Sequence, residues 1–270
     1  MTAPLRVAAA QAESVPGDVA ANVATAVALV GEAAGRGARV VVLPELFLTG
    51  YDPDTWTHEG GLTLDDPMLE PLTGVAAARS VVVVVGAAVR RALDASTLAA
   101  LVIDGPDGVV ATYDKQHLCG PERDFFTAGS GGTSLVVDGW DLGIGICYDG
   151  CFPEHAGAAT ADGALAYLCP AAYYAGGEHR RDLRYAARAL DNGIYVVLAG
   201  LTGRCGSGVF TGGSAVYDPE GRTLTRVQDQ SPAVVVADLD AAEVRRAQAA
   251  NPVEDDRLHA LGPRTRVVLS

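Results

Sequence analysis

The chain has 270 residues, of which 49% are hydrophobic, and this is enough to bury one large core. The 20 Lys and Arg residues against 33 Asp and Glu give a formal net charge of −13, which repels phosphate backbones and anionic lipid and argues against nucleic acid or a membrane surface as partner. No apolar run approaches the roughly 18 residues of a membrane-spanning helix. We therefore expect one soluble domain over residues 1–270.

The five cysteines, at 119, 147, 151, 169 and 205, are an odd number without the regular spacing of a disulfide framework. The apolar run near the N-terminus, "PLRVAAAQAE", is too short for a signal peptide and has no small-residue cleavage pattern, so we interpret it as a first strand. These features predict a cytoplasmic protein whose cysteines are free thiols.

Apolar runs typical of strands buried on both faces recur along the chain, with helical or turn-rich segments between them. They lie at 39–43, 81–89, 98–103, 109–113, 134–137, 142–147, 164–169, 194–200, 214–217 and 233–239. Helices are predicted at 18–35, 67–79, 153–162, 178–192 and 240–249, with Asp18 and Asp66 as caps of the first two. This order of elements, with no linker or repeat, favours α/β layers with a mixed sheet or two sheets.

Three reactive residues follow apolar runs: Glu45 ends "VVVLPE", Lys115 ends "VVATYDK", and Cys147 ends "LGIGIC". In open α/β sheets, functional groups gather beyond the carboxyl ends of buried strands, so these three can share one rim of the fold. Glu45 is the most informative, because a carboxylate directly after buried apolar residues is costly to desolvate unless it is paired or protonated.

The alternation in "LGIGIC" places Cys147 on the same strand face as Gly143 and Gly145, where we expect a backbone or a substrate to approach closely. Pro153 suits the first turn of a following helix, whose positive end would favour the Cys147 thiolate. The simpler alternative is that Cys147 is a small core residue.

Two other interpretations of this region remain open. Cys147, Cys151 and His155 are spaced at four, but they match no standard zinc signature and no fourth ligand is evident. A cysteine–histidine dyad of the papain type would use His117, His155 or His179 as its base. Neither interpretation explains Glu45 and Lys115.

The glycine-rich segment at 200–208, "GLTGRCGSG", lacks the Gly-Lys-Ser/Thr ending of a phosphate-binding loop. We expect it to form a loop near the substrate or at a subunit contact. Tyr173 and Tyr174, which follow a predicted strand, contact substrate or pack in the core. Arg180, Arg181 and Arg184 can hold a substrate carboxylate if one points inward, although a solvated helix face is the simpler interpretation.

Taken together, three segments resemble the nitrilase superfamily of carbon-nitrogen hydrolases: "VVLPELFLTGY" around Glu45, "YDKQHL" around Lys115 and "GICYDGCFPE" around Cys147. The resemblance extends over nearly the whole chain, through "VAAAQ" at 7, "ARALDN" at 187 and "GGSAVYDPEG" at 212. It implies a four-layer α-β-β-α sandwich with two mixed β-sheets, no cofactor or metal, and a homodimer or higher homo-oligomer.

Relatives carry a second glutamate seven residues before a glycine, and here Glu122 stands seven residues before Gly129. Ala128 replaces the usual proline. Gly150 and Cys151 replace a bulky residue and an arginine found in many relatives, which predicts a wider or differently charged pocket. True nitrile-cleaving members follow the cysteine with Trp-Glu, whereas this chain has Tyr148 and Asp149, which favours amides.

The resemblance implies a thiol amidohydrolase that cleaves a small linear amide or N-carbamoyl compound. Cys147 would attack, Glu45 would be the base, and Lys115 with the backbone N–H of Tyr148 would stabilise the oxyanion while Glu122 holds Lys115. Burial would raise the pKa of Glu45, and Lys115 would lower that of Cys147. We expect the pocket to be lined by Tyr51, His117, Tyr148 and Tyr173.

Three alternatives share this constellation or this fold. Nitrile hydrolysis and acyl transfer to an acceptor other than water would use the same thioester chemistry. A catalytically silent binding protein is the third, because a fold alone does not determine a function.

Overall fold

The computed structural model describes residues 2–57, 60–93, 95–258 and 260–269. Its first β-sheet has the order β14-β1-β2-β3-β4-β5, in which β1, β2 and β3 are parallel and the outer pairs are antiparallel. The strands are β1 (Leu5–Gln11), β2 (Val40–Val42), β3 (Val82–Ala92), β4 (Ala95–Asp104), β5 (Val109–Asp114) and β14 (Ala233–Leu239).

The second sheet has the order β13-β12-β9-β8-β7-β6, and β7, β8 and β9 are its parallel strands. Read from β6, it repeats the pairing pattern of the first sheet read from β14. The strands are β6 (Ser134–Val137), β7 (Trp140–Ile144), β8 (Ala166–Ala171), β9 (Tyr195–Gly200), β12 (Ala215–Tyr217) and β13 (Thr223–Arg226). A separate hairpin is formed by β10 (Thr202–Cys205) and β11 (Gly208–Thr211).

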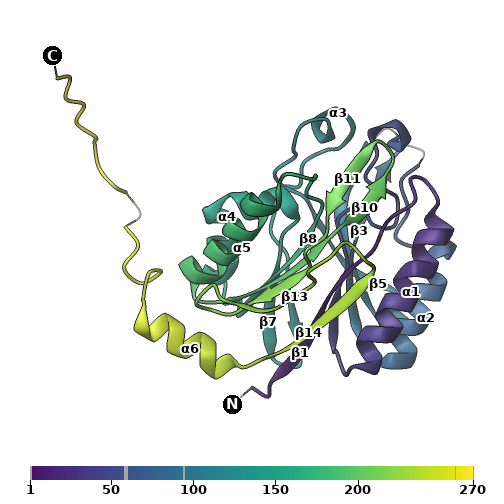
Figure 1. The fold of residues 1–270 in the computed structure, drawn as a ribbon, viewed down its shortest axis with the longest axis horizontal. Coiled ribbons are helices and arrows are strands. Elements are labelled where there is room, and N and C mark those ends of the chain that lie inside the picture. Colours follow the sequence, from purple (N-terminus) through teal and green to yellow (C-terminus); the bar gives the residue numbers. More distant parts are fainter. Residues whose placement is uncertain (1, 58–59, 94, 259, 270) are drawn as a thin grey trace.

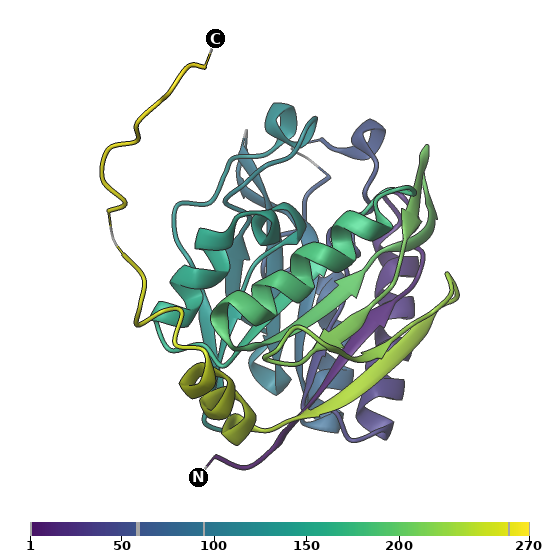
Figure 2. The same ribbon diagram turned by 60° about the vertical axis from the view of Figure 1, so that its left-hand side comes forward.

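Helices connect the parallel strands and cover the outer faces of the two sheets. Helices α1 (Val19–Gly35) and α2 (Glu70–Arg79) lie against the first sheet, and α4 (Pro153–Ala161) and α5 (Glu178–Asn192) lie against the second (Figure 1). Figure 2 shows α5 running across the second sheet. The expected α-β-β-α sandwich with two mixed sheets is confirmed.

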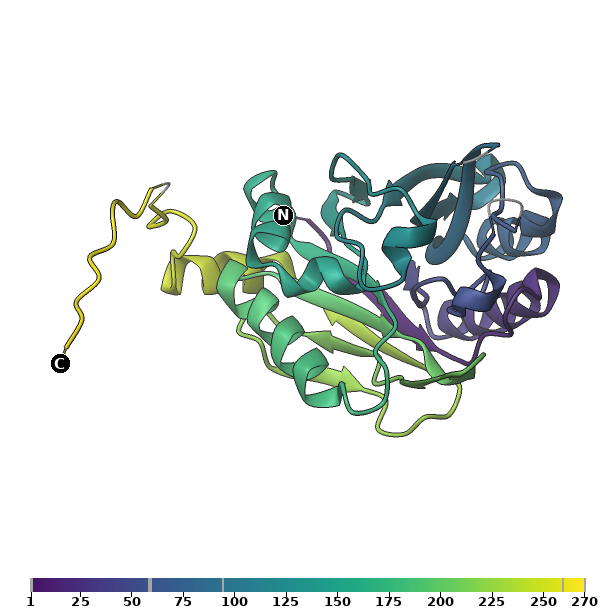
Figure 3. The same ribbon diagram turned by 90° about the horizontal axis from the view of Figure 1, so that it is seen from above.

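The core lies between the sheets, where β1 contacts β9 and β2 contacts β8. Apolar runs such as Val40–Val42 and 195–199 are fully buried, because each sheet has a second sheet on one face and helices on the other. Helix α6 (Ala241–Ala250) follows β14, and residues 260–269 extend away from the sandwich (Figure 3). Within the described residues, no helix has both the length and the apolar character needed to cross a bilayer.

Local signals explain the helix boundaries. The carboxylate of Asp18 accepts from the backbone N–H of Ala21 at 3.0 Å and so caps α1 as expected. Asp66 caps a 3₁₀ turn, Pro67–Leu69, that precedes α2 rather than α2 itself. Gly193, in the left-handed region at φ 59°, ends α5.

Several elements were not expected from the sequence. The segment at 200–208 is not a loop but enters the β10–β11 hairpin. Strand β13 is short and partly exposed, and α3 (Glu122–Phe125) is a single turn. Two further 3₁₀ turns, Pro53–Thr55 and Gly105–Asp107, lie in connections.

Candidate active site

The chain segments after β2, β5 and β7 meet at one end of the sandwich and bring Glu45, Lys115 and Cys147 to one cluster. Lys115 Nζ lies 2.6 Å from Glu45 Oε1 and 2.8 and 2.7 Å from the two carboxylate oxygens of Glu122. The exposed fractions of Glu45, Lys115 and Glu122 are 0%, 1% and 0%. An ammonium is thus held between two carboxylates away from water.

Glu45 is positioned by the close approach of β3. The backbone N–H of Gly86 donates to Pro44 O at 3.0 Å, and the N–H of Leu48 donates to Gly86 O at 3.0 Å. A Cβ atom at Gly86 would lie 2.3 Å from the backbone nitrogen of Leu46, so no larger residue fits. Leu46 itself has φ 49°, a strained conformation directly after the carboxylate.

Glu122 lies at the start of α3 and its carboxylate receives four hydrogen bonds. Besides the two from Lys115, the Tyr51 hydroxyl donates to Oε1 at 2.5 Å and the backbone N–H of Cys119 donates to Oε2 at 2.8 Å. All its acceptor sites face donors, so Glu122 is a fixed counter-charge for Lys115.

Cys147 occupies a sharp turn between β7 and a 3₁₀ helix, Cys147–Cys151, and has φ 43°. Its carbonyl accepts from the Tyr185 hydroxyl at 2.9 Å, and its Sγ lies 3.7 Å from the carbonyl oxygen of Ala172. A side chain in this strained region is held by its surroundings and presented at the strand end.

The expected strand alternation through Cys147 is wrong, because β7 ends at Ile144. The space beside the two glycines is filled by protein rather than by substrate. A Cβ at Gly143 would meet Ala159 of α4 at 2.6 Å, and one at Gly145 would meet the Tyr167 hydroxyl at 1.7 Å. The glycines therefore allow α4 and β8 to pack against β7.

Burial dominates the protonation of this cluster. It raises the pKa of Glu45 to about 7, with Lys115 opposing and Glu122 adding to the rise. Burial alone would lower the pKa of Lys115, but the charges of Glu45 and Glu122 outweigh it and the net pKa lies well above its usual value. At neutral pH, Lys115 is charged and Glu45 is poised to exchange a proton.

The expected lowering of the Cys147 pKa is wrong in the resting protein. Burial and the charge of Glu45 raise the pKa of this thiol well above its usual value, and Lys115 offsets only part of that rise. The positive end of α4 does not reach Cys147 directly, since the 3₁₀ turn lies between Cys147 and Pro153. The sulfur therefore rests as a thiol that needs a base.

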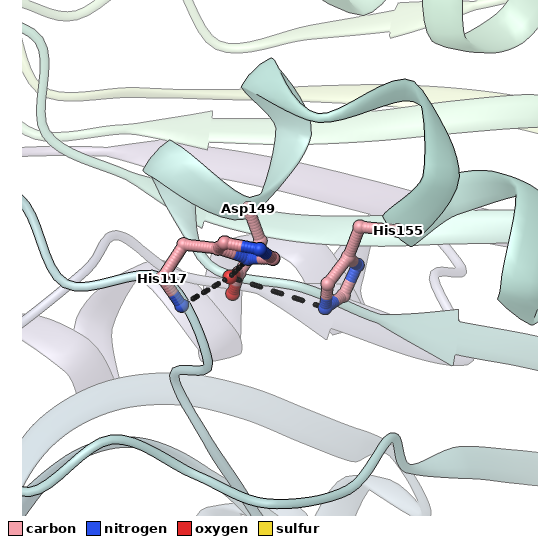
Figure 4. Close-up of side chains that lie close together, drawn as sticks. All are labelled: His117, Asp149 and His155. Atoms are coloured by element: carbon pink, nitrogen blue, oxygen red, sulfur yellow. Dashed lines mark hydrogen bonds and ion pairs between the residues drawn. The ribbon is translucent and has the colours of Figure 1, made fainter.

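Asp149 ties the Cys147 turn to the segment after Lys115 (Figure 4). Its Oδ1 accepts from the backbone N–H and from Nδ1 of His117, at 2.9 and 2.8 Å, and its Oδ2 accepts from the backbone N–H of Ile146 and the hydroxyl of Tyr113, at 3.0 and 2.7 Å. Asp149 is fully buried, so this network fixes the segments that carry Lys115 and Cys147 relative to each other.

The hydroxyl proton of Tyr113 goes to Asp149, so His155 donates to Tyr113 from Nε2 at 2.7 Å. Its Nδ1 then accepts from the Tyr167 hydroxyl at 2.9 Å, which assigns a neutral ring. Burial lowers the pKa of His155, which also favours the neutral ring.

The structure does not bring Cys147, Cys151 and His155 together as a metal site. Among the described residues, the group whose ligand atoms all lie within 4.8 Å of one another is His117, Asp149 and His155. These groups already bond to one another and to two tyrosines, so they form a hydrogen-bond network, and ligation would require breaking it.

A cavity of about 180 Å³ opens over Cys147. Three of the four residues expected to bind substrate line it, Tyr51, Tyr148 and Tyr173, and so does Tyr174. His117 does not: its ring stacks on Phe152 with centroids 3.9 Å apart and faces a separate cavity of about 480 Å³. The expected substrate contact of His117 is thus replaced by its bond to Asp149.

Gly150 and Cys151 were expected to make the pocket wider or differently charged, but neither of them widens it. A Cβ at Gly150 would lie 2.7 Å from the ring of Tyr185, so that ring occupies the space. Cys151, where relatives have an arginine, instead receives the guanidinium of Arg184 from α5, with Nη1 2.7 Å from its Sγ.

The cysteine–histidine dyad finds no support in the geometry. His117 and His155 belong to the Asp149 network, and His179 is exposed on α5. Asp149 and Tyr185 hydrogen-bond to the backbone of the Cys147 turn, which the sequence did not reveal. The one available signal was a carboxylate two residues after the reactive cysteine.

Comparisons with known proteins identify the family of the chain. A protein-family model described as carbon-nitrogen hydrolase matches residues 6–249. A nitrilase of Pyrococcus abyssi is 33% identical over 87% of this chain and 90% of its own. An (R)-stereoselective amidase of a Pseudomonas species is 30% identical over 92% and 90%.

A solved structure has the same fold. It is a double mutant of the amidase from Nesterenkonia sp. AN1 in complex with acrylamide, with a TM-score of 0.83 and 29% identity over 94% of each chain. The chain therefore belongs to the carbon-nitrogen hydrolases of the nitrilase superfamily, enzymes that act on carbon–nitrogen bonds other than peptide bonds.

Proposed function

We propose that the protein is a thiol amidohydrolase that cleaves a small linear amide or N-carbamoyl compound through a thioester on Cys147. The observation that carries this proposal is the state of Glu45. One carboxylate oxygen is bonded to Lys115, whereas Oε2 is buried without a hydrogen-bond partner among the described residues. With a pKa of about 7, this group can both accept and return a proton at neutral pH.

The first half of the reaction releases ammonia or an amine. Glu45 Oε2 takes the proton of the Cys147 thiol as the sulfur bonds to the carbonyl carbon. Lys115 Nζ and the backbone N–H of Tyr148 donate to the oxygen that becomes negative. Glu45 then passes its proton to the nitrogen, the C–N bond breaks, and the thioester remains on Cys147.

The second half regenerates the enzyme. Glu45 accepts a proton from a water molecule whose oxygen bonds to the thioester carbon, and the same two donors stabilise the second oxyanion. The C–S bond breaks and the proton held by Glu45 returns to the sulfur. Glu45 thus serves both steps, which requires a pKa near the working pH.

The raised pKa of the Cys147 thiol supports this order of events. A preformed thiolate would need no base, whereas a buried thiol does. Lys115 contributes most when charge develops on the substrate oxygen, because its own charge in the resting state is balanced by two carboxylates.

Ammonia release from a panel of linear ω-amides, N-carbamoyl amino acids, N-carbamoyl amines and nitriles tests the proposal. We expect turnover of amides or N-carbamoyl compounds and little of nitriles. Hydroxylamine should divert the thioester to a hydroxamate, and product analysis with candidate acceptors separates hydrolysis from acyl transfer. Activity confined to nitriles would contradict the proposal.

The expectations of a cytoplasmic location and of a homodimer or higher homo-oligomer belong to the same proposal. Light scattering of the purified protein tests the second expectation, and a monomer at all concentrations would contradict it.

A further inference from the structure

The geometry points to a substrate that carries a carboxylate at the end opposite its amide, with Arg184 and Arg180 of α5 as the residues that bind it. This inference rests on the proposed function, since it names the substrate class of the same cavity. Both arginines line the cavity that Cys147 opens into, together with Tyr148 and Tyr173.

The arginines of α5 divide between two tasks. Arg181 is buried and donates to Thr211 Oγ1 and to the carbonyl of Gly212, both at 2.7 Å, and it also pairs with Asp182 at 2.7 Å. Arg181 therefore joins α5 to the strand end at β11. Arg180 and Arg184 are four residues apart, so they project from one face of the helix, and that face borders the cavity.

Neither cavity arginine has a carboxylate partner within the described part of the chain. Arg181 and Arg188, on the same helix, pair with Asp182 and Asp191, at 2.7 and 3.1 Å. Arg184 contacts the sulfur of Cys151 and the hydroxyl of Tyr173 instead. No carboxylate among the described residues neutralises the charge of this guanidinium, which lies at the edge of the substrate cavity. It is therefore available to bind a negatively charged group of the substrate.

The rest of the cavity cannot balance these charges. Glu122 also lines the cavity and Glu45 lies behind it, but Lys115 lies between these two carboxylates and donates hydrogen bonds to both. The net charge of −13 disfavours anions in general. Exposed charges are screened over about 8 Å at physiological salt, so nearby arginines decide the local preference.

The small side chain of Cys151 allows the guanidinium of Arg184 to reach the edge of the cavity. The short side chain leaves room for the guanidinium, whose Nη1 is 2.7 Å from Sγ, and Tyr173 lies 3.7 Å from the same sulfur through its hydroxyl. The positive group therefore comes from α5 rather than from the turn after Cys147. Cys151 stands where many relatives have an arginine. The replacement removes one positive charge from the turn, but it also makes room for Arg184 to supply another from α5.

The cavity volume suits a small substrate. About 180 Å³ is roughly six times the volume of a water molecule in the liquid. A monoamide of a short dicarboxylic acid is the class that fits, with the amide at Cys147 and the carboxylate at Arg184 and Arg180. Succinamate is a suitable probe, and succinamide is a neutral compound of the same size.

The experiment compares kcat/KM for succinamate and succinamide, measured by ammonia release from the purified full chain at pH 7.5. Loss of a charge-assisted hydrogen bond predicts a preference for succinamate of about 10-fold to 100-fold. In Arg184→Gln this ratio should fall at least tenfold, mainly through KM for succinamate. Arg180→Gln should lower it less, because Arg180 is more exposed, and Arg184→Lys should restore part of it.

Arg245→Gln is the matched control, since it removes the same charge from the exposed face of α6 and should keep the ratio of the parent protein. Equal kcat/KM for the two compounds in the parent protein would overturn this inference and leave the proposed function standing. So would an equal loss for both compounds in Arg184→Gln. Hydrolysis of neither compound, with turnover of other amides or N-carbamoyl compounds, would also overturn this inference alone. Failure to hydrolyse any linear amide or N-carbamoyl compound would overturn the proposed function, and this inference with it.

Discussion

Lys115 Nζ lies 2.6 Å from Glu45 Oε1, and neither side chain is reached by solvent. Breaking a buried ion pair by removing one partner is costly because the other charge is left uncompensated. We therefore explain the presence of this buried ion pair by its role in the reaction. Burial raises the pKa of Glu45 to about 7 although Lys115 opposes the rise, and the pair keeps an ammonium in the cluster that the mechanism uses.

Replacing Lys115 tests the oxyanion role. Lys115→Ala should lower kcat on the order of a thousandfold or more. It should also destabilise the fold by about 3–5 kcal/mol, because Glu45 and Glu122 are left as buried like charges. Kinetics and denaturant unfolding measure the two effects. A mild loss of activity would demote Lys115 to a structural residue.

The pH dependence of kcat/KM tests the role of Glu45. The base must be deprotonated to accept the thiol proton, so activity should fall as the pH drops through about 7 and should level off above it. Glu45→Gln should remove both the activity and this limb of the profile. A profile that stays level down to pH 5 would mean that Glu45 is not the base.

Asp149→Asn tests the network that joins the two catalytic segments. The amide group of asparagine cannot accept where it presents N–H donors, so at least one of the four hydrogen bonds is lost inside the protein. We expect a destabilisation of about 2–4 kcal/mol and a clear loss of kcat through displacement of the Cys147 turn. Unchanged thermal unfolding would contradict this role.

Gly86→Ala tests whether the position of Glu45 depends on the close approach of β3. The added methyl group would overlap the backbone at Leu46, so Glu45 should shift and kcat should fall about a hundredfold. Gly74→Ala is the matched control, because a Cβ there meets nothing within 4 Å and α2 should gain slightly in stability. Equal activity of the two variants would refute the dependence.

Much of the fold follows from local signals. Uninterrupted apolar runs such as the one at 39–43 predict strands covered on both faces, and caps such as Asp18 mark where helices begin. The elements that were not predicted lack such signals. One turn of helix at Glu122 has no periodicity, and the hairpin after Thr202 is rich in glycine.

The residues of the cluster could be predicted because Glu45 and Cys147 follow buried runs, and the resemblance joined them to Lys115, although the strand before Lys115 is only partly buried. Their electrostatics could not. The pKa of Cys147 depends on how much water the surrounding layers exclude, and a sequence does not reveal that balance. His117 likewise stands in the lysine motif, but its orientation is set by Asp149, which a motif does not show.

Mass spectrometry of the enzyme quenched during turnover of a linear amide tests the central claim most directly. The account predicts an acyl adduct on the peptide that contains Cys147, its conversion to a hydroxamate by hydroxylamine, and the loss of both adduct and turnover in a folded Cys147→Ala protein. Undiminished amide cleavage by Cys147→Ala, or an adduct on another residue such as the exposed Cys119, would contradict it.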